Sequence, residues 1–268
     1  MNTQFWGPDG WKLLHSIAQN YPVNPDVKTQ QLYVNFYESI KYVLPCIYCR
    51  NSYTEYIEQL PVRDFTKNRD SMTRWLYELH NKVNGKLRGQ GLLHEQDPVY
   101  KEVVRRYESY VREVNAGDCT CFPGMLFIYC VLFNFPLKKE EMDPVRYAHY
   151  ILFFNYLAEI LPFPRIKEHF QEFLRKHPIE HAMESRATIK RWGYKLENHL
   201  YRKFGKKCMS YKERCTMIEL NRAGCSKISG SKKGKNGTCR LPTPRIKKVE
   251  EQIHSIIRKY PNSELNKK

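Results

Sequence analysis

Apolar residues recur three or four positions apart along most of this 268-residue chain, and no segment of convincing length alternates between apolar and polar residues. The first spacing predicts amphipathic helices, and the lack of alternation argues against β-strands. We therefore expect an all-α fold. Five helices are predicted near the start of the chain, at about residues 9–21, 28–43, 46–60, 71–87 and 98–114.

Turn-forming residues and charge divide the chain into three parts. The turn at Asn115–Asp118 ends the fifth predicted helix, so we expect a helical bundle over residues 1–117. A second, mainly helical domain is predicted over 118–222, and a basic, partly flexible tail over 223–268. The net charge of +17 resides in residues 186–268, which carry 23 Lys and Arg against 6 Asp and Glu. This excess fits an anionic partner such as nucleic acid or a membrane surface, or simply a solvated extension.

The composition limits the class of protein further. At 41% hydrophobic residues, the chain is too apolar to be disordered throughout. No apolar run reaches the roughly 18 residues of a membrane span, so we expect a soluble protein. Met1–Trp11 lacks the pattern of a signal peptide. Within the tail, a short amphipathic helix is predicted from the apolar residues Val249, Ile253, Ile256 and Ile257.

Two cysteines stand alone in the first 118 residues, as Pro45-Cys46-Ile47-Tyr48-Cys49. Two thiols separated by two residues at a helix start can close a disulfide, and the positive end of the helix favours the thiolate, so the pair can be a redox couple. The same spacing supplies half of a zinc site, which needs two further ligands. A buried pair of free thiols is the third interpretation.

Aromatic and polar residues share faces of two predicted helices. Trp11 and His15 stand four positions apart, as do His80 and Asn84, with Asn81 beside them. Singly, each is explained by a hydrogen-bonded core histidine or an exposed amide. Together they predict a pocket wall with aromatic surfaces and hydrogen-bond donors, suited to a flat aromatic cofactor with polar edges.

Three motifs carry a family resemblance. They are Trp11-Lys-Leu-Leu-His15, Pro45-Cys46-Ile-Tyr-Cys49 and Trp75-Leu-Tyr-Glu-Leu-His80-Asn81-Lys-Val83-Asn84-Gly-Lys86-Leu87. In order and separation they resemble the ALR/Erv family of FAD-linked sulfhydryl oxidases, over roughly residues 5–115. Trp6-Gly7-Pro8 and the appended second block look most like members encoded by large DNA viruses.

The resemblance implies an FAD-binding four-helix bundle with a short fifth helix, which is often a homodimer. It implies a thiol oxidase that forms disulfides in protein dithiol substrates and passes their electrons to O2, giving hydrogen peroxide. By position, Cys49 would lie against the flavin and Cys46 would exchange with incoming dithiols. The implied FAD contacts are Trp6, Trp11, His15, His80, Asn81, Asn84 and Lys86, and no metal is expected.

The chain departs from the family pattern in two places. No cysteine is present to brace the bundle by a further disulfide, and Arg88-Gly-Gln-Gly-Leu92 replaces the usual Gly-Lys-Pro stretch. Tyr100 and Tyr107 are therefore the candidates for the lower FAD contacts.

The resemblance also implies a shuttle dithiol outside the bundle, because many family members carry one. Cys119 and Cys121 are the candidates here, since one intervening residue gives a strained, readily reduced disulfide. Two free thiols, or a link to Cys130, are the alternatives. Four later cysteines have no zinc-like spacing and leave disulfides, a second relay or a weak metal site open; they are Cys208, Cys215, Cys225 and Cys239.

A second function class also fits the sequence: a non-enzymatic basic adaptor that binds nucleic acid or an acidic partner, with a structural cysteine pair. For the oxidase, a chain without a signal peptide indicates the host cytoplasm or the virion if the protein is viral. The mitochondrial intermembrane space is the alternative location.

Overall fold

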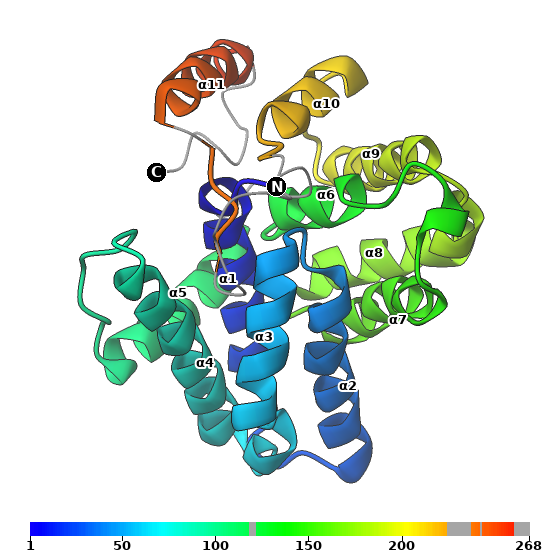
Figure 1. Ribbon diagram of the computed structural model, residues 1–268. Helices are drawn as coiled ribbons and strands as arrows, with labels where there is room; N and C mark the ends of the chain where they lie inside the picture. Colours follow the sequence, from blue (N-terminus) through cyan, green and yellow to red (C-terminus); the bar gives the residue numbers. More distant parts are fainter. Residues whose placement is uncertain (118–121, 224–236, 242, 260–268) are drawn as a thin grey trace.

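The computed structural model describes residues 1–117, 122–223, 237–241 and 243–259, and within these ranges the protein is all-α, as predicted (Figure 1). Its regular helices are α1 (Thr3–Gln19), α2 (Val27–Val43), α3 (Ile47–Gln59), α4 (Arg69–Gly89), α5 (Tyr100–Ala116), α6 (Met125–Phe133), α7 (Pro144–Ile160), α8 (Pro164–Lys176), α9 (Arg186–Lys203), α10 (Tyr211–Leu220) and α11 (Thr243–Ile257). Short 3-10 turns lie at Val62–Phe65, Lys139–Glu141 and Ile179–Ala182. None of the described helices is both long and apolar enough to cross a membrane.

Side-chain caps set where the bundle helices begin. The Asp26 carboxylate accepts the Thr29 N–H at 2.7 Å and starts α2, close to the predicted residue 28. The predicted start of α4 at Ser71 is wrong by two residues, because the Asn68 side chain is the cap and accepts the Ser71 N–H at 2.9 Å. Capping satisfies an N–H that has no partner within the helix.

Helix α1 begins six residues earlier than the expected start at Asp9. The Asn2 side chain caps it, and the main-chain N–H of Thr3 donates to the Cys239 carbonyl at 2.8 Å. Pro8 therefore lies inside the helix. The extra turn carries Trp6 into the core, where it is 7% exposed. Contacts with the C-terminal part of the chain fix this start. The local sequence pattern could not predict them.

The helices of the second block pack directly on the bundle, α6 against α1 and α7 against α2 (Figure 1). The Asp9 carboxylate of α1 accepts the N–H groups of Gly124, Leu126 and Phe127 at 3.0–3.2 Å, which satisfies the start of α6. Gly10 allows close approach here, because a Cβ would stand 3.2 Å from the Phe127 ring. Every residue of α6 is buried.

Residues 237–241 return from the C-terminal part of the chain to the bundle, where this segment runs beside α1 (Figure 1). The Lys86 Nζ donates to the Gly237 carbonyl at 2.9 Å, and the Thr238 hydroxyl donates to Gln90 at 2.6 Å. We call residues 237–241 the C-terminal strap. Residues 224–236, which belong to the tail predicted to be partly flexible, lie outside the described residues.

Helix α11 corresponds to the amphipathic helix predicted in the tail, and it lies against α10. Val249, Ile253 and Ile257 are buried, whereas Ile256 is only partly covered. Part of the basic tail is therefore packed against the rest of the molecule.

Candidate functional site

The cysteine pair sits at the start of α3. Cys46 is the N-cap residue, and its sulfur accepts the Cys49 N–H at 3.3 Å. Both thiols are free. Cys46 is only 2% exposed, because the strap and the N-terminus of the chain cover it. The Met1 ammonium donates to the Pro45 carbonyl at 3.1 Å beside it.

The two sulfurs have opposite electrostatics. The hydrogen bond from the Cys49 thiol lowers the pKa of Cys46 to about 6, and the main-chain N–H groups of Cys49 and Cys239 add to this effect. The same thiol–thiolate contact, together with burial, raises the pKa of Cys49 well above its ordinary value. In the reduced pair Cys46 is thus the thiolate, the nucleophilic form of cysteine, while Cys49 holds the proton.

A cavity of about 700 Å³ opens beside Cys49 and extends between α1, α4 and α5. Its size is within the range of about 300–1,000 Å³ that is typical of ligand pockets. Five of the seven predicted cofactor contacts line it: Trp6, Trp11, His80, Asn84 and Lys86.

Aromatic rings form one wall of this cavity. Trp11 and His80 are stacked, with ring centroids 3.8 Å apart and planes inclined by 12°. His15 lies behind them, with its Nε2 3.1 Å from His80 Nδ1, and its own ring stacks on Tyr107 at 4.4 Å. Burial lowers the pKa of His80 to about 4 and that of His15 well below its usual value. Both imidazoles are therefore neutral at pH 7, and the wall is uncharged.

Positive charge and hydrogen-bond donors occupy other parts of the lining. Lys12, Lys86, Arg106 and Arg240 all contribute to it, and among the described residues that line the cavity none is a carboxylate. The indole N–H of Trp6 is buried without a hydrogen-bond partner in the described structure. A flat aromatic ligand that carries negative charge fits this combination of stacked rings, cations and an unused donor.

The other sequence predictions fall in different places. Asn81 does not line the cavity, and His15 supports it from behind. Of the two candidate lower contacts Tyr107 lines it, whereas the Tyr100 hydroxyl faces Thr73 at 2.8 Å outside it. The candidate shuttle residues Cys119 and Cys121 lie outside the described residues.

Several lining residues were missed from the sequence: Ser52, Tyr53, Arg106, Tyr110, Thr238 and Arg240. Ser52 and Tyr53 stand one helical turn after Cys49, so their position relative to the cysteine motif was a usable signal. Arg106 and Tyr110 flank Tyr107 on α5 at helical spacing. Thr238 and Arg240 had no local signal, because only the path of the strap brings them here.

Cysteines outside the pair differ in state. Cys130, Cys208 and Cys215 are free thiols, whereas Cys239 is disulfide-bonded. Cys225 is not among the described residues. No group of three or more potential metal ligands occurs within the described ranges, so the zinc interpretation of Cys46 and Cys49 gains no support there.

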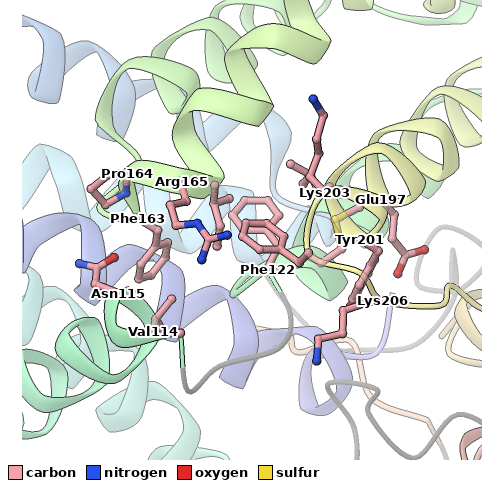
Figure 2. Close-up of a pocket in the computed structure, with 15 residues that line it drawn as sticks. Val114, Asn115, Phe122, Phe163, Pro164, Arg165, Glu197, Tyr201, Lys203 and Lys206 are labelled. Atoms are coloured by element: carbon pink, nitrogen blue, oxygen red, sulfur yellow. The ribbon is translucent and has the colours of Figure 1, made fainter.

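A second cavity, of about 410 Å³, lies away from the cysteine pair (Figure 2). Figure 2 shows Val114 and Phe163 on one side of it, with Lys203 and Lys206 on the other and Phe122 between them. No residue predicted for the functional site lines it. The cavity beside Cys49 is therefore the candidate functional site.

Comparison with known proteins points to the same part of the chain. The family model described as Erv1 / Alr family matches residues 8–105. A probable FAD-linked sulfhydryl oxidase, R368 of Acanthamoeba polyphaga mimivirus, is 35% identical over 85 residues, which cover 31% of this chain and 59% of the relative. Mitochondrial ERV1 of Saccharomyces cerevisiae, also named a FAD-linked sulfhydryl oxidase, is 34% identical over 82 residues, covering 31% of this chain and 42% of the relative.

The FAD-linked sulfhydryl oxidase of African swine fever virus is 33% identical over 86 residues, covering 31% of this chain and 67% of the relative. The matches thus span less than two thirds of the mimivirus and yeast proteins and about two thirds of the swine fever virus protein. In each case they leave more than half of this chain unmatched.

Proposed function

Because the chain belongs to the Erv1 / Alr family, we propose that it is a FAD-dependent thiol oxidase that forms disulfides in protein substrates. The observation that carries the proposal is the position of Cys49 in the wall of a cavity whose stacked rings and cations match the chemistry of FAD. The names of the mimivirus and yeast relatives support the same activity and cofactor.

The residues present fit FAD. The neutral rings of Trp11 and His80 offer a surface on which a flat heteroaromatic ring can stack. The unused indole N–H of Trp6 can donate to a polar edge, and Lys86 and Arg106 can face the phosphates. When bound, FAD supplies the acceptor for the two electrons of a dithiol and passes them to O2, giving hydrogen peroxide.

The cysteine pair has the asymmetry that thiol–disulfide exchange needs. Starting from the Cys46–Cys49 disulfide, a substrate thiolate attacks the Cys46 sulfur, forming a mixed disulfide and releasing the Cys49 thiolate. The second substrate thiolate attacks its own mixed disulfide, which yields the substrate disulfide and releases the Cys46 thiolate. The low pKa of Cys46, about 6, makes it a good leaving group in this second step. The positive charge of Lys86 favours the Cys49 thiolate.

The structure adds one requirement to this scheme. Cys46 is nearly inaccessible, so a protein thiol reaches it only when the strap or the N-terminus moves aside. The opening of these segments is thus a step in substrate entry.

Absorption and oxygen consumption test the proposal. Purified protein should be yellow, or become so with added FAD, and should consume O2 with a reduced dithiol. Cys49→Ser should retain flavin and lose turnover, and Cys46→Ser should also retain flavin but block dithiol entry. Cys130→Ser is the matched control, because Cys130 is a buried free thiol that does not line the cavity. A colourless protein that cannot be loaded with FAD would contradict the assignment.

Other features remain part of the proposal. Homodimerisation, a relay through Cys119 and Cys121, and an anionic partner for residues 186–268 rest on the family resemblance and on charge. The relatives include viral and mitochondrial proteins, which fits a host cytoplasmic or virion location as well as the intermembrane space. Light scattering would test the dimer, and fractionation of cells that make the protein would test its location.

A further inference from the structure

Arg240 is an unexpected part of the cavity. It lies far beyond residues 8–105, the part of the chain that matches the family model, yet its side chain lines the cavity beside Cys49. The strap holds it there: the Thr3 N–H and hydroxyl both donate to the Cys239 carbonyl, at 2.8 and 3.1 Å. The Nη2 group of Arg240 donates to the Leu92 carbonyl at 3.1 Å. Arg240 is thus held through the main chain of the neighbouring Cys239 and through the tip of its own side chain.

The Nε–H group of this guanidinium is buried and has no hydrogen-bond partner in the described structure. A buried donor without a partner is costly, and it costs more when the group is charged. No carboxylate among the described lining residues balances the charge. Lys86, another cation of the lining, donates to the Ser52 hydroxyl and to the Gly237 carbonyl and can act beside Arg240. Arg240 therefore lines the proposed cofactor site with a positive charge that no carboxylate of the described lining balances.

We propose that Arg240 binds the diphosphate of the cofactor, and that the strap thereby closes over the bound cofactor. This inference rests on the proposed function, because it assumes that FAD occupies the cavity. A guanidinium presents several N–H donors in a planar fork that matches phosphate oxygens. The two phosphates carry the permanent negative charge of FAD, so they are the groups that an unpaired cation attracts. On this basis a residue of the appended part of the chain completes a site built mainly by the bundle.

Affinity for FAD tests the proposal without depending on turnover. The variants are Arg240→Gln, which removes the charge, and Arg240→Lys, which keeps the charge but not the fork. Arg245→Gln is the matched control, because Arg245 is an exposed arginine five residues further along. The dissociation constant of FAD is measured on flavin-stripped protein by the quenching of flavin fluorescence, at low and at high salt.

Loss of a charge-assisted hydrogen bond predicts that Arg240→Gln weakens FAD binding by about 10- to 100-fold. The FAD affinity of Arg240→Lys should lie between that of the wild type and that of Arg240→Gln. Arg245→Gln should change the affinity by less than about twofold. The dependence of binding on salt should also become weaker in Arg240→Gln, since one charge–charge contact is gone. Circular dichroism of the flavin-free variants checks that the fold survives loss of the hydrogen bond from Arg240 to the Leu92 carbonyl.

Two results would overturn the inference. Unchanged FAD affinity in Arg240→Gln would show that the guanidinium does not bind the cofactor. A loss of affinity with an unchanged salt dependence would place the contact on the uncharged ring system. If Arg240→Gln does not fold, the same two measurements on Arg240→Met decide, because this variant also removes the charge. If the wild type itself does not bind FAD, the proposed function is refuted. This result differs from those that would refute only the role of Arg240.

Discussion

At the scale of single residues, the position of each sulfur on α3 sets its chemistry. Cys46 occupies the N-cap, where the main-chain N–H groups of Cys49 and Cys239 surround its sulfur. Cys49 is one turn further on, facing the cavity. The spacing of the cysteines predicted a redox pair as one of three options. The spacing could not predict the contact with Cys239, because Cys239 lies far away in the sequence.

Alkylation of the reduced pair should reveal a low pKa at Cys46. The rate of reaction with iodoacetamide is expected to rise through a pH of about 6 and then level off, because the thiolate is present above this pKa and lost below it. In Cys49→Ala the rise should move toward the ordinary thiol range of about 8.5, since the thiol donor is missing. Mass spectrometry of the Cys46 peptide measures both profiles. Superimposable profiles would contradict the assigned hydrogen bond.

Buried neutral histidines should make stability depend on pH. The pKa of His80 falls from 6.5 to about 4 on folding, so the unfolded chain takes up a proton before the folded one does as the pH falls. Stability is therefore full above pH 6.5 and is lost progressively toward pH 4, by up to about 3 kcal/mol for this group. Urea unfolding of flavin-free protein at pH 7 and pH 5 measures the loss. His80→Gln should make stability depend less on pH. An equally steep pH dependence in this variant would refute the role of His80.

At the scale of helices and segments, the sequence predicted the interior of each bundle helix better than its ends. The apolar stripes of α1 to α5 could be predicted from spacing alone, because a helix that buries one face needs apolar residues three or four positions apart. The starts of α1 and α4 depend on caps at Asn2 and Asn68, which have no distinct pattern among many polar residues. The strap has no periodicity at all, so its place over the site could not be predicted.

Removing the strap should expose Cys46. Truncation after Ala223 deletes the segment that covers this thiol, so its alkylation at pH 7 is expected to accelerate by at least about tenfold. Truncation after Lys259 keeps the strap and serves as the control. Circular dichroism checks that both proteins remain helical. An unchanged rate in a folded short protein would mean that the N-terminus alone protects Cys46.

At the scale of the whole molecule, the bundle and the second block share one continuous hydrophobic core. Phe36 of α2 stacks on Phe153 of α7 with ring centroids 5.6 Å apart, and the Tyr42 carbonyl accepts Arg146 Nε at 2.9 Å. The sequence predicted both blocks as helical, and it predicted a boundary near residue 118. The extent of the contact was not predictable, because it depends on which faces of distant helices meet.

Asp9 should couple the two blocks energetically. Asp9→Ala leaves three N–H groups at the start of α6 without their acceptor, so we expect the free energy of unfolding to fall by about 3 kcal/mol. Asp9→Asn retains one acceptor oxygen and should lose less. Urea unfolding of the three proteins provides the comparison. A change below about 0.5 kcal/mol in Asp9→Ala would place it among neutral surface substitutions and contradict this role.

Under the proposed function, the depth of Cys46 also affects how the protein would work in the presence of the reducing thiols of a cell. Small thiols such as glutathione meet the same barrier as a protein client, since the sulfur they would attack is only 2% exposed. A folded client that docks and displaces the covering segments gains access, whereas a freely diffusing tripeptide has little binding energy with which to do so. Under the proposed function, this shielding would limit the oxidation of glutathione and confine disulfide formation to proteins that bind and displace the covering segments.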